Sequence, residues 1–206
     1  SRSHDGLRCR CRIRNTVALF RFSERALSSD RPNQRIITSH AGMGKKLRAE
    51  IHPVGLGEVD SVATINVRPE IGGSSLYEDV ENVEICSTYE VPIIRFDHLF
   101  ADFARPALCK IDVQGAELAV LKGMGERLAE IDVLIVETSL IATLKGNAPE
   151  LAEVMAFFGS HDFCLYDIVG MTRRPLDQAL AQIDAVFVPK NSALRRDRRW
   201  GQQSRN

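Results

Sequence analysis

The stretch LCKIDVQGAELAVLKG, residues 108–123, decides how the rest of the chain is interpreted. It begins with a short apolar strand pattern and continues, after a Gln-Gly pair, into a helix pattern. Lys110 and Asp112 lie inside the strand pattern, and Glu117 falls in the first turn of the helix. Charged side chains are costly in a core unless they are paired or solvated, so their positions need a physical reason.

Side chains alternate between the two faces of a strand, which places Lys110 and Asp112 on the same face, where they can form an ion pair. In open α/β sheets, ligands bind outside the carboxyl ends of the strands, and Asp112 lies at such an end. We therefore expect Asp112 to face a cleft. Glu117, favoured by the helix dipole, is expected at the rim of the same cleft.

A second strand pattern, DVLIVET at residues 132–138, places Glu137 near its carboxyl end. If the two strands are neighbours, about 4.8 Å apart, Asp112 and Glu137 flank one crevice. Two carboxylates in one site tend to separate in pKa, which suits one of them for work as a base. The alternative is structural, with Asp112 paired only to Lys110 and Glu137 capping a loop. The same end placement on two strands favours a functional site.

Strand and helix patterns alternate from residue 49 to residue 189, which predicts βαβ units and a mostly parallel sheet. The last two strands are expected to form an antiparallel edge. Strands are expected within 49–58, 61–67, the first part of 89–103, 107–113, 132–138, 163–170 and 183–189. Helices are expected near Asp97, from Gly115 to about Ile131 with an interruption at Gly123 and Gly125, and within 149–163.

The two ends of the chain differ from the middle in charge. Residues 1–50 hold 12 Lys/Arg against 4 Asp/Glu, residues 51–189 hold 9 against 22, and residues 190–206 hold 6 against 1. Residues 1–48 show no strong strand pattern and no GxGxxG, so we expect an atypical basic segment, disordered or non-native, and a basic flexible tail after residue 189. No aromatic residues alternate with the N-terminal arginines, so nucleic-acid binding is not expected.

The composition describes a globular protein, because 44% of the 206 residues are hydrophobic. No apolar run is long enough to cross a membrane. The five cysteines are scattered and odd in number. This pattern disfavours a disulfide framework and predicts a cytoplasmic location, where thiols stay reduced. The pattern leaves the oligomeric state open.

Residues 49–189 resemble the FkbM family of S-adenosylmethionine-dependent methyltransferases. The resemblance rests on LCKIDVQGAELAVLKGM followed by IDVLIVETS, and on VGLGE, GGSSL, VPIIRFDHL and IDAVFVP in the same order. It implies an α/β, class I methyltransferase-like (Rossmann-like) fold whose N-terminal part is incomplete or atypical. It also implies methyl transfer from S-adenosyl-L-methionine to a hydroxyl of a small-molecule acceptor such as a sugar or a polyketide.

Two groups of site residues follow from the strand positions and the resemblance. In the first group, Asp112 lies near the reacting centre, Glu137 acts as base or orienter, and Lys110 tunes Asp112. The second group, the cofactor-binding candidates, consists of Gly55, Ser74, Ser75 and Glu117. A metal is not expected: His98 could join the two carboxylates as a third ligand, but isolated histidines more often lie at the surface.

The chain departs from the family pattern in two places. Gln114 stands where the family has Glu, which keeps hydrogen bonding but removes a charge. Residues 1–48 show no recognisable form of the Gly-rich cofactor loop that the family carries upstream of VGLGE; the alternative is true divergence, with AGMGKK at residues 41–46 as a degraded loop. The alternative function is therefore a non-catalytic or defective methyltransferase remnant that lacks the cofactor loop.

Overall fold

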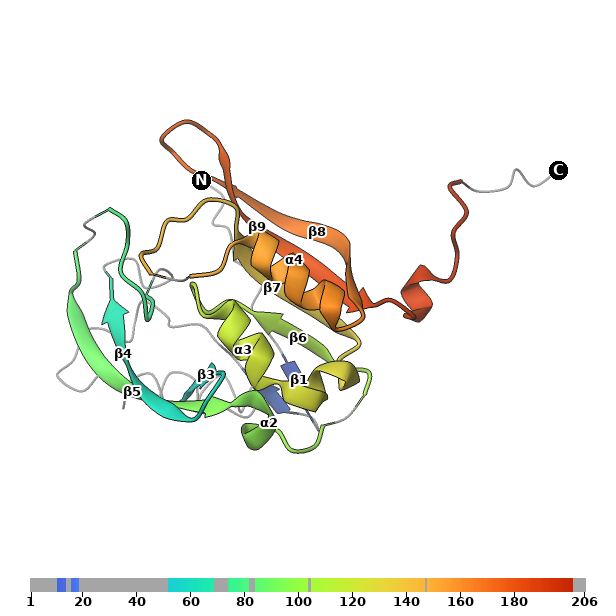
Figure 1. Ribbon diagram of the computed structural model, residues 1–206, viewed down its shortest axis with the longest axis horizontal. Coiled ribbons are helices and arrows are strands. Elements are labelled where there is room, and N and C mark those ends of the chain that lie inside the picture. The colour runs from blue at the N-terminus through green and yellow to red at the C-terminus, as the bar shows by residue number, and fades with distance from the viewer. Residues whose placement is uncertain are drawn as a thin grey trace.

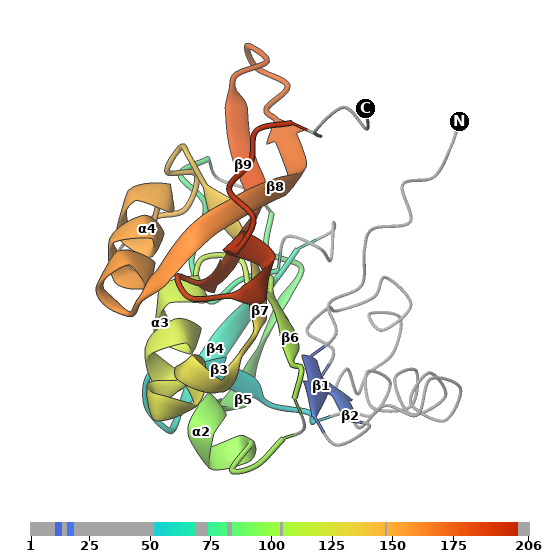
Figure 2. The same ribbon diagram turned by 90° about the vertical axis from the view of Figure 1, so that its right-hand side faces the viewer.

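The computed structural model describes residues 11–13, 16–18, 52–68, 74–81, 84–103, 105–146 and 148–201. In these residues the protein is an α/β structure with mixed sheets and few helices (Figure 1). The strands form a two-stranded, a three-stranded and a four-stranded sheet within the described ranges. The two-stranded sheet pairs β1 (Cys11–Ile13) with β2 (Thr16–Ala18), and β1 lies beside the four-stranded sheet, next to β6 (Leu108–Ile111) (Figure 2).

The four-stranded sheet has the order β6-β7-β9-β8. It consists of β6, β7 (Val133–Ser139), β8 (Phe163–Arg173) and β9 (Leu180–Pro189). β6 and β7 are parallel, and β9 is antiparallel to both of its neighbours. The expected antiparallel C-terminal strand is thus confirmed, but the described sheets are mixed rather than mostly parallel. The strands β6, β7 and β8 run in one direction, and β9 lies between β7 and β8 and runs in the opposite direction. Both ladders of β9 are therefore antiparallel.

The main core lies between the four-stranded sheet and two helices, α3 (Glu117–Gly123) and α4 (Leu151–Ser160), which cover the same face (Figures 1 and 2). β7 alternates along its length, and Leu134 and Val136 are fully buried against this layer. Phe158 of α4 stacks on Phe187 of β9 with ring centroids 3.9 Å apart. α3 ends at Gly123 and the 3-10 helix η3 (Gly125–Glu130) follows it, so the interruption expected at these two glycines is confirmed.

The three-stranded sheet packs beside α3 and has β5 (Ser87–Arg95) at its centre. β3 (Gly55–Gly57) pairs with β5 in parallel, and β4 (Ser61–Val67) pairs with it antiparallel. Along β4 the side chains of Ile65 and Val67 are buried, while Val62 is exposed. The strand expected within 61–67 is thus confirmed, with Ile65 and Val67 facing the core. The short helix α2 (Phe96–Leu99) follows β5 directly and buries Phe96.

Gly123 joins α3 to the three-stranded sheet by a close backbone approach. A Cβ atom at this position would overlap the carbonyl oxygen of Gly57. Because backbone cannot swing aside as a side chain can, Gly123→Ala is expected to lower the free energy of unfolding by about 2 kcal/mol, as overpacking does. The matched control is Gly159→Ala in α4, where an added Cβ meets no atom within 4 Å.

Urea unfolding of both variants measures the difference. The control is expected to keep the wild-type stability or to gain up to about 1 kcal/mol from the higher helix propensity of Ala. If the Gly123→Ala variant were as stable as the control, the close approach of α3 to β3 would be wrong.

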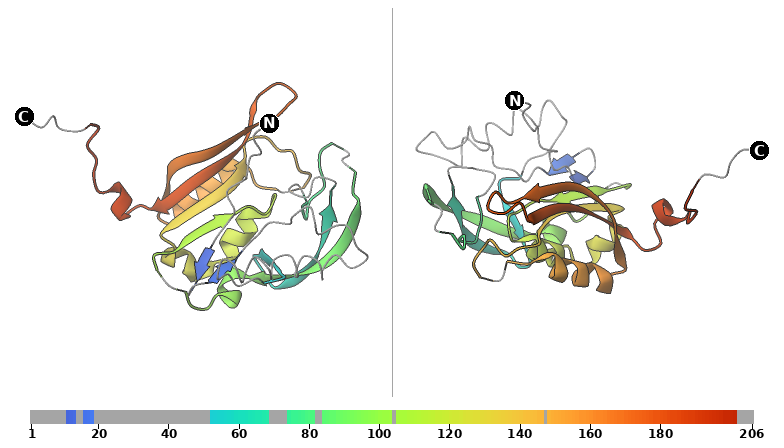
Figure 3. Two further views of the ribbon diagram at one scale, coloured as in Figure 1. Left: turned by 180° about the vertical axis from the view of Figure 1, so that it is seen from behind. Right: turned by 90° about the horizontal axis from the view of Figure 1, so that it is seen from above.

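The ends of the chain fall only partly within the described residues. The expectation for residues 1–48 lies outside them, apart from the backbone of β1 and β2. After β9, Lys190 pairs with Asp162, and the 3-10 helix η4 (Ala193–Arg195) leads away from the sheets towards a fully exposed Trp200 (Figures 1 and 3). The flexibility of this tail stays a prediction.

Two further findings concern the described part of the chain as a whole. None of its helices combines the length and the apolar character needed to span a bilayer. Cys86 and Cys164 are free thiols.

Candidate active site

Lys110, at the carboxyl end of β6, is the centre of a buried charge cluster. Its Nζ lies 3.0 Å from Asp112 Oδ2 and 3.3 Å from Asp184 Oδ1 on β9. Burial alone would lower the pKa of Lys110, but the two carboxylates outweigh it and hold this pKa above its ordinary value. The pair expected from strand alternation is therefore confirmed, and Lys110 stays charged because it has two acidic partners.

The side chain of Gln114 connects Asp112 to Glu137. Its Nε2 atom donates to Asp112 Oδ1 at 3.1 Å and to Glu137 Oε2 at 2.6 Å. β6 and β7 are neighbours, as expected, so both carboxylates lie at one edge of the sheet. A glutamate at position 114 would offer only acceptors, whereas the amide supplies the donor that two adjacent carboxylates need.

The two bridged carboxyl groups differ strongly in proton affinity. Burial, together with the nearby charge of Asp112, raises the pKa of Glu137 to about 8. Burial would also raise the pKa of Asp112, but the charge of Lys110 and a hydrogen bond from Glu137 outweigh it and lower this pKa. At neutral pH the pair therefore holds one proton, mainly on Glu137. This is the separation expected for two carboxylates that share a site.

A serine holds the turn that carries Gln114. The backbone of Gln114 has a φ of 51°, in the left-handed region that residues other than Gly rarely adopt. Ser75 Oγ donates to the Gln114 carbonyl at 2.5 Å and accepts from the Tyr77 N–H at 3.0 Å. The neighbouring Ser74 Oγ accepts from the Arg68 N–H at 3.3 Å. Both serines are buried: Ser75 fixes the turn at Gln114, whereas Ser74 fixes the backbone of Arg68. Their cofactor-binding role stays a prediction.

Glu117 lies at the start of α3 and is buried. Both of its carboxylate oxygens accept from the Gly115 N–H, at 3.0 and 3.1 Å. Burial raises the pKa of Glu117, although these backbone bonds oppose the shift. Gly115 has a φ of 100°, and an added Cβ would meet Leu144 Cδ1 at 2.7 Å, so only glycine fits this turn.

A cavity of about 290 Å³ opens beside this turn. The β8–β9 hairpin extends past the end of β7 (Figure 1) and contributes Arg173 and Arg174 to the lining. Gln114, Glu117 and Glu137 also line the cavity, whereas Asp112 and Lys110 do not. A ligand in the cavity would therefore meet Glu137 directly and Asp112 only through its neighbours. The volume is at the lower end of the range for small-molecule sites.

A comparison with protein families agrees with this site geometry. The model of the Methyltransferase FkbM domain family matches residues 9–166, more than half of the chain. The chain belongs to the FkbM methyltransferase family. A search of curated proteins and a search of solved structures each find no significant match. The FkbM match supports a methyltransferase, and it begins inside the basic segment 1–48.

Gly55, like Ser74 and Ser75, is a cofactor-binding candidate of this FkbM chain that does not line the cavity. It lies in β3 opposite Ile93 of β5, and an added Cβ would meet Ile93 Cδ1 at 2.6 Å. Gly55 is absent from the cavity lining, which includes only Glu117 among the four candidates. The close contact with Ile93 gives this glycine a packing role, and its role towards a cofactor stays a prediction.

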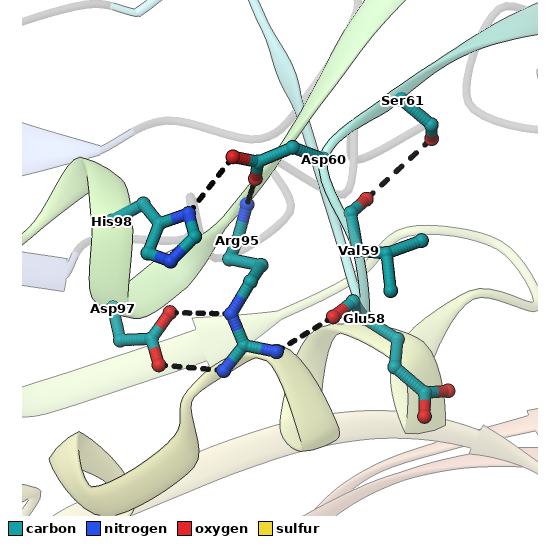
Figure 4. A network of polar contacts seen from close by, with 7 residues as sticks. All are labelled: Glu58, Val59, Asp60, Ser61, Arg95, Asp97 and His98. Atoms are coloured by element: carbon teal, nitrogen blue, oxygen red, sulfur yellow. Dashed lines mark hydrogen bonds and ion pairs between the residues drawn. The ribbon is translucent and has the colours of Figure 1, made fainter.

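His98 lies far from the carboxylate pair. Its Nδ1 is 2.8 Å from Asp60 Oδ2, in a network in which Arg95 binds Asp97 (Figure 4). An added Cβ at Gly125, just after α3, would meet Asp97 Oδ2 at 2.6 Å, so this network lies at the opposite end of α3 from Gln114. His98 therefore cannot complete a metal site with the two carboxylates. The described residues contain no cluster of His, Cys, Asp or Glu suited to a metal ion.

Sequence reasoning missed Asp184 and Arg173. Asp184 faces Glu137 across the β7–β9 ladder. Its signal was a charge within the apolar run IDAVFVP, the same kind of signal that identified Lys110. Arg173 reaches the cavity only because β8 extends to residue 173, beyond the end expected for this strand.

Proposed function

We propose that this FkbM protein transfers a methyl group from S-adenosyl-L-methionine to a hydroxyl oxygen of a small acceptor bound beside Glu137. The observation that carries the proposal is the bridged carboxylate pair, of which Glu137 lines the cavity. The class I methyltransferase-like fold is part of the proposal. It is supported by the strand order β6-β7-β9-β8, with β9 alone reversed.

Glu137 is proposed as the base. S-adenosylmethionine, when bound, supplies an electrophilic methyl group. The ionised Glu137 carboxylate accepts the proton of the acceptor hydroxyl as that oxygen loses electron density to the new bond. A pKa of about 8 makes Glu137 a stronger base than an ordinary carboxylate, while a useful fraction stays ionised near neutral pH. Positioning of the two reactants provides the remainder of the rate, as is usual in group transfer.

Gln114, Asp112 and Lys110 are proposed to position and tune this base. The Gln114 amide holds Glu137 Oε2, which leaves the other oxygen of the carboxylate to be shared between Asp112 and the acceptor. Lys110 keeps Asp112 ionised, and the negative charge of Asp112 raises the basicity of Glu137.

The described residues suit the amino-acid end of the cofactor. Glu117 lines the cavity, and its carboxylate has acceptor positions beyond those used by Gly115, as an ammonium group requires. The cofactor loop implied by the resemblance precedes VGLGE, in a segment that is largely outside the described residues. Glu117 is thus proposed to hold the cofactor at its amino group.

Titration calorimetry of the full chain with S-adenosylmethionine and S-adenosylhomocysteine tests the proposal. We expect micromolar binding of both. A second experiment with methyl-labelled cofactor and a panel of hydroxylated sugars and phenols should transfer label to oxygen. If the chain bound neither compound, the proposal would fail, and the alternative function, a non-catalytic methyltransferase remnant, would be favoured.

The pH dependence of turnover follows from the raised pKa of Glu137. The ionised form is the active base, so kcat should rise about tenfold per pH unit below pH 8 and level off above it. Rates at saturating cofactor and acceptor, measured from about pH 6 to about pH 10, check this expectation. If the chemical step gave a flat profile, Glu137 would not be the base.

A further inference from the structure

Arginines are concentrated at the cavity. Residues 51–189 hold only 9 Lys/Arg against 22 Asp/Glu, yet Arg68, Arg173 and Arg174 all line this one cavity. An acidic domain repels anions over its surface, so a local group of guanidinium side chains gives the cavity a different preference from its surroundings.

The three arginines differ in how their charge is compensated. Arg68 Nη2 lies 2.7 Å from Asp79 Oδ2, and Arg174 binds both carboxylate oxygens of Asp177. Arg173 Nη1 donates to the Gln178 carbonyl at 2.8 Å, and no carboxylate within the described ranges forms an ion pair with it. Arg173 therefore brings a charge to the cavity that the neighbouring carboxylates do not neutralise.

We propose that the acceptor carries an anionic group, a carboxylate, sulfate or phosphate, which the Arg173 guanidinium binds while the reacting hydroxyl lies at Glu137. This inference rests on the proposed function and adds the class of acceptor to it. A guanidinium has five donors in a planar fork, of which Gln178 takes one, and the fork matches the oxygens of such anions.

The acidic residues of the lining do not oppose an anion as strongly as their number suggests. Asp79 is paired with Arg68, and Glu137 holds the proton of the carboxylate pair at neutral pH. Glu117 accepts from the Gly115 N–H, and its remaining acceptor positions are those proposed above for the cofactor ammonium group. The Arg173 charge is thus the main uncompensated charge that a ligand meets among the lining residues. A neutral acceptor of the same shape would leave it without a partner.

The test compares Arg173→Gln with a matched control, Arg195→Gln. Arg195 is also exposed, and its Nη1 also donates to one backbone carbonyl, that of Lys190 at 3.0 Å. It lies in η4, which leads away from the sheets (Figure 1), and it is not among the residues that line the cavity. Both substitutions remove one exposed charge and one surface hydrogen bond. Any difference in ligand affinity between the two variants is therefore due to the position of Arg173 at the cavity.

The probes are matched neutral and anionic compounds, and ligand-observed NMR on the full chain without cofactor gives their Kd values. One set is glucose, glucuronate, glucose 6-sulfate and glucose 6-phosphate, which separates the three anions. The other is 4-hydroxybenzyl alcohol and 4-hydroxybenzoate. In the wild type and in Arg195→Gln, we expect at least one anionic member to bind about tenfold more tightly than its neutral partner.

In Arg173→Gln this preference should fall to about twofold or less, and added NaCl should weaken it in the wild type.

If no pair showed a preference in the wild type, or if both variants lost it equally, the proposal would be overturned. The measurement contains no cofactor, so it is independent of methyl transfer. A preference without S-adenosylmethionine binding would refute the methyltransferase proposal alone, and methyl transfer without a preference would refute the anionic acceptor alone.

Discussion

Glu137→Gln is expected to lower kcat by about 10²- to 10⁴-fold, the usual contribution of a positioned general base. The amide has the shape of the protonated carboxyl group. Its oxygen can still accept from Gln114, and its NH₂ group can donate to Asp112. The variant therefore keeps the geometry of the pair but cannot accept a proton from the acceptor. Turnover at saturating cofactor, measured together with cofactor affinity, checks the result, because the affinity should be unchanged.

The stability of the same variant separates a catalytic role from a structural one. The folded-state pKa of Glu137 is about 8 against an ordinary value of 4.5, so the folded state binds this proton more tightly. The stability that this proton gives is complete at low pH and is lost as the pH rises from 4.5 through about 8. Glu137→Gln should therefore melt at a higher temperature than the wild type above pH 8. Loss of activity with lower stability at every pH would make Glu137 a structural residue.

Asp112→Asn is expected to lower the free energy of unfolding by about 3 kcal/mol, because it removes one partner of a buried charge. Lys110 would retain Asp184, at 3.3 Å, as its remaining acidic partner. The pKa of Asp112 lies below its ordinary value of 3.8, so the difference from the wild type should be complete above that value and shrink as the pH falls below it. Urea unfolding at several pH values measures the difference.

The control for Asp112→Asn is Glu58→Gln, which breaks an exposed pair with Lys122. Exposed pairs contribute about 0–1 kcal/mol, so this variant should unfold almost as the wild type does. Asp112→Asn should also reduce turnover, since Glu137 loses the neighbouring charge that raises its pKa. A variant that is destabilised but fully active per folded molecule would end the functional assignment of Asp112 and leave it as the partner of Lys110.

The parts of the site that obey local rules could be predicted from the sequence. Alternation along one strand was enough to pair Lys110 with Asp112, and two successive strand ends were enough to bring Glu137 beside them. The Gln114 bridge could not be predicted in this way, because it depends on a left-handed backbone held by a serine 39 residues away. A single residue type at position 114 carries no information about that conformation.

The sheet shows the same limit on a larger scale. The strand patterns at 132–138 and 183–189 predicted β7 and β9 well, and the antiparallel edge was confirmed. The mixed character of the sheet was missed because the position of β9, between β7 and β8, is set by packing between distant segments. The extension of β8 to Arg173 was missed because exposed residues occupy most of this strand, which removes the apolar signal.

The insertion of β9 between β7 and β8 has a consequence for how the chain is made. On the ribosome, β8 is synthesised before the strand that ties it to the sheet, so it has no neighbour in its own layer until β9 emerges. The hairpin can form locally and then dock against β7 as a unit, which is the order that low loop-closure entropy favours. Asp184 arrives with that docking step. The nascent protein therefore cannot complete the partner set of Lys110, or close the cavity, until β9 has been translated.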